Sequence, residues 1–152
     1  MPAESIRELI IQDIESTLLT VVAGALYHHT ILKVVRFEAW TPNLNVYPAC
    51  AITLLDSDES DSESSTRQTV TMRFLIMAEL EQHANLERDT SRLIDDIKRV
   101  LVVDITRNSL ALDTQVTSAR PFLTDGAVPR GGATIEGNVR FRHLFGDPYT
   151  LA

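Results

Sequence analysis

The chain has 152 residues, of which 44% are hydrophobic and 23% charged, and its formal net charge at pH 7 is -7. This length is that of one domain with a single core, and no apolar run approaches the roughly 20 residues that a membrane-spanning helix needs. The negative charge argues against sequence-specific nucleic-acid binding, which depends on clustered Lys and Arg. We therefore expect a single soluble domain over residues 1–152 with no membrane partner.

Cysteine and arginine usage narrows the class of protein further. The single cysteine, Cys50, allows neither an internal disulfide nor a cysteine metal cluster. Residues 1–4 lack the basic start of a secretory signal, so we expect the protein to stay in the cytoplasm where it is made. All basic residues except Lys33 and Lys98 are arginines, which suit planar pairing with carboxylates at protein interfaces. This usage favours assembly with other subunits.

The N-terminal region predicts a helix followed by a strand. Residues 5–8, Ser-Ile-Arg-Glu, form a capping box, in which the serine and glutamate side chains each accept from the other's backbone N–H. Apolar residues at spacings of three and four predict one buried helix face, and the helix should end near Gly24. These residues are Ile6, Leu9, Ile10, Ile14, Leu18, Val21 and Val22. After a connector, residues 31–40 predict a strand and residues 41–45 a turn.

Two further strands are predicted on either side of an acidic segment. Pro48 opens a strand over residues 47–54, in which Cys50, Ile52 and Leu54 share one face. Residues 56–65 then hold five carboxylates and no apolar side chain, so we predict an acidic flexible loop over residues 56–66. Its carboxylates belong to Asp56, Asp58, Glu59, Asp61 and Glu63.

Residues 69–80 predict the most buried strand. One face alternates without a break through Val70, Met72, Phe74, Ile76, Ala78 and Leu80. The other face changes from polar side chains to Leu75 and Met77. We therefore expect a helix or a neighbouring subunit to cover the second face near Leu80.

An amphipathic helix is predicted to follow over residues 86–101. Its apolar stripe consists of Leu86, Thr90, Leu93, Ile94, Ile97, Val100 and Leu101. Its outer face is expected to hold Glu87, Arg88, Arg92, Asp95, Asp96 and Arg99. Residues 102–112 give no clear assignment, residues 115–124 predict a strand, and the turn formers within residues 125–132 predict a flexible hairpin connection.

The last strand, residues 133–145, has an almost strict alternation. Ala133, Ile135, Gly137, Val139, Phe141, His143 and Phe145 are expected on one face, and Thr134, Glu136, Asn138, Arg140 and Arg142 on the other. Gly146-Asp147-Pro148 should end the strand, so that a short tail leaves the sheet. Together the elements predict an α+β domain, with a mainly antiparallel sheet and two amphipathic helices packed on one face.

No catalytic, cofactor-binding or metal site is predicted. Cys50 lies in phase with apolar neighbours, which favours a buried inert thiol over a nucleophile. The four histidines never occur at the i, i+4 spacing of a helical metal site. The acidic run lacks the glycine of a calcium loop, and Gly131-Gly132 precedes a strand without a following lysine, unlike a phosphate-binding loop. These patterns favour a protein that is not an enzyme.

The C-terminal end carries a resemblance to a known family. Val139-Arg140-Phe141-Arg142-His143 followed by Gly146-Asp147-Pro148 resembles the ending of tail terminator (tail completion) proteins of tailed bacteriophages. An N-terminal helix, a hairpin containing Tyr-Pro, a long second helix and a closing pair of strands extend the similarity over most of the chain.

The resemblance implies a structural virion protein of the tail and neck, assembled in the host cytoplasm. Such a protein forms a ring, usually a hexamer, on the head-proximal end of the tail tube. The ring stops polymerisation of the tail tube protein and provides the surface that a neck or head-completion protein binds, while DNA passes through the lumen. Two alternatives stay open: a head-tail connector or neck protein of the same virion, and a small cytoplasmic enzyme with an unrecognised site.

Candidate interface residues follow from the strand faces. Arg140 and Arg142 are either solvated charges that prevent unwanted strand pairing or, as the resemblance implies, a subunit or tube interface. His143 is in phase with Phe141 and is expected to be a core or interface histidine, not a catalyst. The candidate subunit or tube interface therefore comprises Leu75, Met77, Arg140, Arg142 and His143, and the acidic segment is the candidate lumen-facing or tube-facing surface.

Overall fold

The structure is a computed structural model that describes residues 3–37, 45–64, 66–81, 85–124 and 130–152. In chain order its elements are α1 (Ile6–Leu18), β1 (Lys33–Arg36), β2 (Ala49–Ser64), β3 (Arg67–Leu80), α2 (Leu86–Val103), β4 (Asp113–Thr124), β5 (Arg130–Leu144) and β6 (Asp147–Leu151). The strands form one sheet in the order β1-β2-β3-β5-β4, and β6 pairs with β5. The β1–β2 pair is parallel, and the other described pairs are antiparallel.

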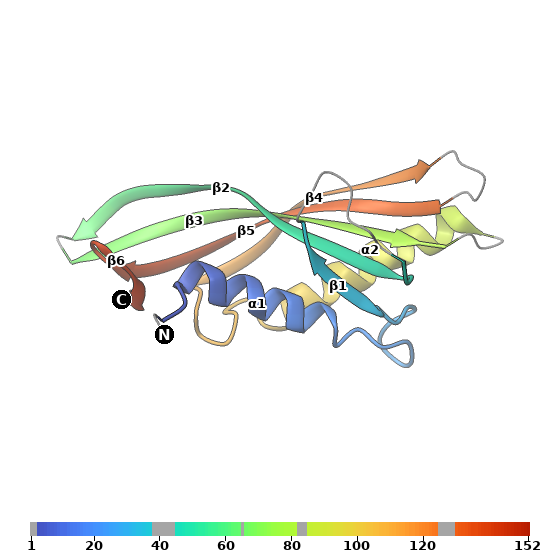
Figure 1. The fold of residues 1–152 in the computed structure, drawn as a ribbon, viewed down its shortest axis with the longest axis horizontal. Coiled ribbons are helices and arrows are strands. Elements are labelled where there is room, and N and C mark those ends of the chain that lie inside the picture. Colours follow the sequence, from blue (N-terminus) through green and yellow to red (C-terminus); the bar gives the residue numbers. More distant parts are fainter. Residues whose placement is uncertain (1–2, 38–44, 65, 82–84, 125–129) are drawn as a thin grey trace.

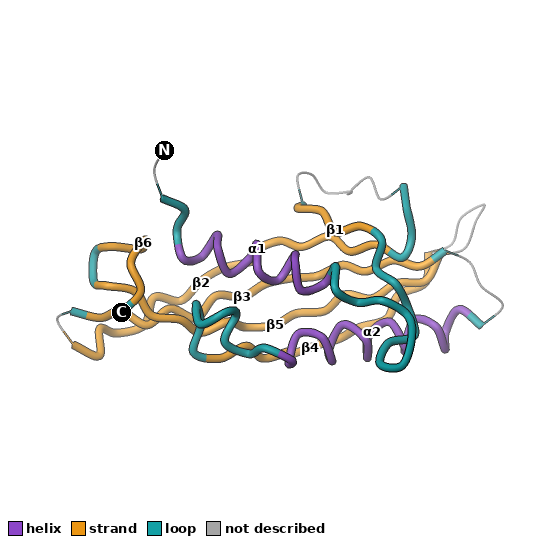
Figure 2. Tube along the Cα trace, turned by 90° about the horizontal axis from the view of Figure 1, so that it is seen from below, coloured by secondary structure: helices purple, strands orange, loops and turns teal. Residues whose placement is uncertain are grey.

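Both helices lie on the same face of a long twisted sheet (Figures 1 and 2). The hydrophobic core lies between this face and the helices, and all six predicted core residues of β3 are fully buried. The α+β class and the packing of both helices on one face are therefore confirmed. The predicted strands over residues 47–54, 69–80 and 115–124 and the second helix are also present, with shifts of a few residues or extensions at their ends.

The first helix begins where the capping signal places it but ends early. Ser5 Oγ accepts the backbone N–H of Glu8 at 3.2 Å. The carboxylate of Glu8 accepts instead from Arg36 of β1, at 2.8 Å, and so ties the helix to the sheet. The helix ends at Leu18, so Val22, predicted on its buried face, lies beyond the helix and is exposed. Strand β1 covers part of predicted strand 31–40, and residues 38–44 lie outside the described residues.

The prediction of an acidic loop at 56–66 is wrong over residues 56–64, because β2 continues as a strand to Ser64, and Ser65 lies outside the described residues. Its backbone pairs with β3 from Asp58 opposite Thr71 to Ser64 opposite Arg67. Backbone hydrogen bonds can hold such a strand while its side chains remain in water, so a lack of apolar residues does not exclude pairing. An irregularity between Leu54 and Ser57 adds one residue to β2 and changes which side chains face the helices.

Gly131 and Gly132, predicted in a flexible connection, are part of β5 and pair with both β3 and β4. At Gly131 an added Cβ would lie 2.5 Å from Thr90 Oγ1 and 2.8 Å from the Leu86 side chain. Glycine is therefore required here because α2 packs directly on the strand backbone. Residues 125–129 of the predicted connection lie outside the described residues.

The predicted departure of the tail from the sheet is also wrong. Gly146 adopts φ +77°, which a glycine accepts without strain, and the chain reverses into β6. β6 pairs with β5 at His143, which lies opposite Leu151. This pairing lies beyond Arg140, the last residue of β5 that pairs with β4. Phe145, predicted in the core, lies in this reversal and is 61% exposed. Pro148 is tolerated because β6 is an edge strand.

Candidate subunit interface

The face of the sheet opposite α1 and α2 carries four of the five predicted interface residues. This open face carries Thr69, Thr71, Arg73, Leu75 and Met77 on β3 and Thr134, Glu136, Asn138, Arg140 and Arg142 on β5. Their sequence neighbours on both strands point into the core. Thr69 pairs with Arg142 and Met77 with Thr134, so the arginines and the two apolar residues lie toward opposite ends of one surface.

His143 does not join this surface. Its side chain lies on the helix side of β5 and the residue is only 5% exposed. Its ring nitrogen Nδ1 lies 2.7 Å from the Leu144 carbonyl oxygen and so donates to it. The ring is tilted against Phe141 with centroids 6.3 Å apart. His143 therefore has the structural role of a satisfied core histidine in the free chain, which was one of its two predicted roles.

Leu75 and Met77 are half-buried, although no helix in the described ranges covers them. Neighbouring strands shield them, because Leu75 lies between Thr53 of β2 and Glu136 of β5, and Met77 lies beside Ala51. The expectation that a helix covers this end of β3 on its second face is therefore wrong for the described part of the chain. Cover by a second subunit stays a prediction.

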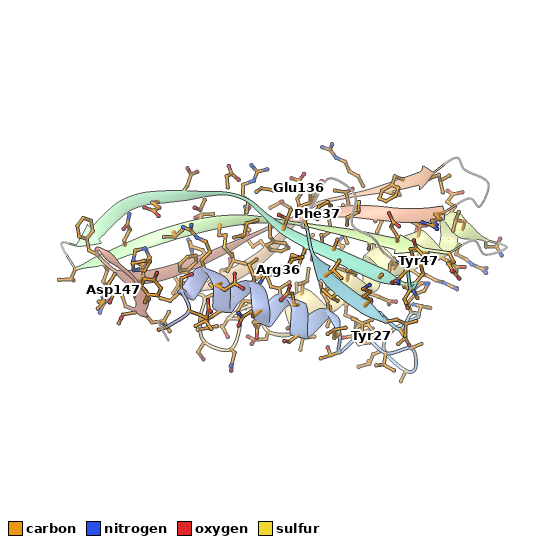
Figure 3. The ribbon with its side chains drawn as sticks, in the orientation of Figure 1. Tyr27, Arg36, Phe37, Tyr47, Glu136 and Asp147 are labelled. Carbon is orange, nitrogen blue, oxygen red and sulfur yellow. The ribbon has the colours of Figure 1, made fainter. Side chains whose placement is uncertain are left out.

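An ion-pair network spans the middle of the open face. Arg73 of β3 lies 3.2 Å from an Asp56 oxygen on β2 and 3.4 Å from a Glu136 oxygen on β5. Figure 3 shows Glu136 on the side of the sheet away from α1, and Arg36 toward α1. All three network groups remain partly in water, so the pairs add little to stability, about 0–1 kcal/mol each. The guanidinium of Arg73 is therefore already paired with carboxylates of its own chain.

Arg140 occupies a different environment. It is exposed and lines a shallow polar pocket of about 200 Å³ together with Thr71, Asp113, Gln115 and Asn138. Asp113 of β4 is its direct neighbour across the ladder. A carboxylate or amide of another protein could therefore reach the guanidinium of Arg140 without displacing apolar packing.

The predicted acidic residues divide between two sides of β2. Glu59 lies opposite Val70 on the helix side and pairs with Arg7 of α1 at 3.5 Å. Asp58 lies opposite Thr71 on the open face and is exposed. Asp61 and Glu63 belong to the same strand, but their side chains lie outside the described residues. The structure thus does not place the five carboxylates on one surface.

A buried carboxylate on α2 contradicts one sequence prediction. Asp96, expected on the outer face, is only 3% exposed. Its oxygens accept the backbone N–H groups of His28 at 3.0 Å and His29 at 2.9 Å, and lie 3.1 Å from His29 Nδ1. Asp96 therefore anchors the connector after α1 to α2. Asp96 lies three residues after Leu93 and four before Val100. This spacing places it on the apolar stripe of the helix and could have predicted its burial.

Arg107, in the segment that gave no sequence assignment, is fully buried. It donates to the Leu101 carbonyl at the end of α2 and to Thr114 Oγ1 at 3.2 Å, and lies 3.5 Å from Asp13 of α1. Arg107, Asn108 and Ser109 adopt positive φ angles of 48°, 56° and 67°. Non-glycine residues rarely hold this conformation unless surrounding contacts require it.

Burial and hydrogen bonds shift the pKa values of the charged groups around this turn. Burial lowers the pKa of Arg107, and the attraction of Asp13 only partly offsets it. Burial likewise raises the pKa of Asp13 against the attraction of Arg107. Hydrogen bonds from Thr106 and Asn108 lower the pKa of Asp104, which caps the turn. The arginine therefore serves packing between α1, α2 and β4.

Cys50 is buried, as its phase with apolar neighbours predicted. Burial raises the pKa of the Cys50 thiol to about 12, so the side chain is protonated and unreactive at neutral pH. Over the described ranges, no three His, Cys, Asp or Glu side chains gather closely enough to hold a metal ion. None of the described helices is long and apolar enough to cross a membrane.

No protein-family model matches the chain, and no curated protein is significantly similar to it. Function is therefore proposed from the resemblance in sequence together with the contacts of the described residues.

Proposed function

We propose that the chain is a structural virion protein that resembles phage tail terminators. Copies of the chain form a ring, a hexamer by the resemblance, on the head-proximal end of the tail tube. There the ring stops tube polymerisation and offers a surface to a neck or head-completion protein. The observation that carries this proposal is the open face of the sheet, with Leu75 and Met77 toward one end and Arg140 and Arg142 toward the other.

The open face is large enough to form a specific interface. β3 has 14 residues and spans about 45 Å at about 3.3 Å per residue. Four long strands (β2, β3, β5 and β4), each about 4.8 Å wide, give a width of about 20 Å and so an area on the order of 900 Å². A standard protein interface buries about 800 Å² on each partner. One face of the sheet thus supplies the surface that a subunit or the tube requires.

The chemistry of the open face also suits a protein partner. Half-buried apolar side chains would become fully buried against a neighbour, and arginines are enriched in interfaces because they pair bidentately with carboxylates. Arg140 lies in a polar pocket that such a carboxylate could enter. The exposed carboxylates of β2 would repel DNA phosphates if this strand lay near the lumen, which would keep passing DNA from sticking.

Native mass spectrometry tests the proposal of a ring. Protein released from assembled tails, or concentrated after purification, should give a cyclic species with a mass close to six chains. The heterologous contact of a ring is repeated by rotation until it closes, so one closed stoichiometry should dominate over a ladder of sizes. Monomer alone in both samples would contradict the proposal.

A further inference from the structure

Four apolar residues are exposed where β5 reverses into β6. This apolar tip consists of Leu144, Phe145, Tyr149 and Leu151, which are between 38% and 61% exposed. The reversal at Gly146 places these four residues within eight residues of sequence, at the end of the sheet where β5 pairs with β6. Exposed Phe and Tyr side chains are typical anchors of protein interfaces.

A pocket lies between the start of α2 and the end of β4. This end pocket has a volume of about 410 Å³ and is lined by Glu87, Thr90, Ser91, Pro121, Phe122 and Leu123. A pocket of this size accepts aromatic side chains. Leu123 lies at the edge of this pocket. Its side chain is 65% exposed, so an apolar surface is in contact with water there. The close approach of α2 at Gly131 holds the helix and the strand pair together beside it.

The apolar tip and the end pocket lie at opposite ends of the sheet, as the positions of β6 and the start of α2 show (Figure 1). Leu123 of the pocket pairs with Gly131, and Leu144 of the tip lies 13 residues further along β5. At about 3.3 Å per residue the two features are about 43 Å apart. A rigid strand joins them, so the tip cannot reach the pocket of its own chain.

We propose that the apolar tip of one copy of this chain occupies the end pocket of the next copy. Phe145 provides the aromatic anchor for the apolar wall at Pro121 and Leu123, and the phenol of Tyr149 meets the polar edge at Glu87 and Ser91. A projection at one end and a matching pocket at the other end of the same chain define a heterologous contact, which closes into a ring when the rotation permits. This inference rests on the proposed function, because it names the contact between subunits of the ring.

Disulfide trapping between two different single variants tests this contact. Phe145→Cys and Ser91→Cys are prepared separately, confirmed as folded by thermal unfolding, mixed in equal amounts and oxidised mildly. Cys50 is fully buried and should not compete. Because a disulfide needs Cβ atoms about 4 Å apart, crosslinking reports the proposed neighbours directly. Phe145→Cys mixed with Val103→Cys, a position 74% exposed on α2, is the matched control.

We expect the Phe145–Ser91 mixture to give about tenfold more crosslinked dimer than the control, because proximity raises the effective thiol concentration. Tyr149→Cys gives a second tip position if Phe145→Cys is unstable. Crosslinking no greater than control, under conditions in which native mass spectrometry detects the ring, overturns this contact and leaves the proposed function standing. If no ring forms either, both proposals fail.

Discussion

Arg107→Met will lower the free energy of unfolding by about 3 kcal/mol, the lower end of the range for removing one partner of a buried charged network. Methionine keeps much of the side-chain volume but removes the hydrogen bonds to the Leu101 carbonyl and Thr114. It also leaves Asp13 without its buried cation. Arg107, Asn108 and Ser109 all adopt positive φ angles, and this turn would then lose the side-chain contacts that hold it.

Chemical denaturation of the purified chain measures this change, with Arg88→Met as the matched control. Arg88 is exposed on α2, so its replacement should alter the free energy of unfolding by no more than about 0.5 kcal/mol. If Arg107→Met costs no more than the control, Arg107 does not join α1, α2 and β4 in the way that its contacts indicate.

The second large effect is expected on assembly. The double variant Arg140→Glu, Arg142→Glu should remain folded but fail in ring closure or in capping the tail tube. Both side chains lie on the open face, away from the core residues Val139 and Phe141. Each lost interfacial charge pair costs about 2–5 kcal/mol, and a ring repeats the loss at every interface. Arg140→Glu also faces Asp113 across the ladder, which adds a destabilisation of under about 1 kcal/mol.

Tail length measured in electron micrographs is the readout for this variant. Tails should be irregular and excessively long and should fail to join heads, because nothing stops polymerisation of the tube. Lys98→Glu with Arg99→Glu is the control: it makes the same change of charge on the exposed side of α2 and should leave tail length normal. Tails of uniform length from the double variant on β5 would show that this strand face is ordinary surface.

Much of the fold could be predicted because its periodicities are strong. The six alternating core residues of β3 and the stripe of α2 each match one period over more than ten residues. The Ser5 cap located the start of α1 to the residue. Such local patterns depend on neighbours within one element, which the sequence displays directly.

Features that depend on distant partners could not be predicted. The acidic part of β2 is a strand because β3 pairs with its backbone, and composition carries no sign of that pairing. β6 forms because β4 ends opposite Arg140 and leaves an edge of β5 free. Arg107 is buried by contacts with α1 and β4, both remote in sequence. No periodicity in the neighbouring sequence indicates that such a residue is buried.

The candidate interface was predictable only in part for the same reason. Alternation placed Arg140 and Arg142 away from the core, as observed. Whether Leu75 and Met77 share their surface depended on the register between β3 and β5, which the structure supplies. His143 and Glu59 lie on the helix side of the sheet. Glu59 lies there because the irregularity between Leu54 and Ser57 changes the alternation of side chains along β2.

The position of the chain on tails made without heads tests the central claim most directly. Tails are purified from cells that make no heads, and the chain is located by electron microscopy with a bound antibody fragment or by reconstruction of the tail end. The proposed function predicts one closed ring of this chain on the head-proximal end of every finished tail. Tails that end normally without the chain, with the chain found only on heads, would contradict it and assign the chain to the head-tail connector or neck instead.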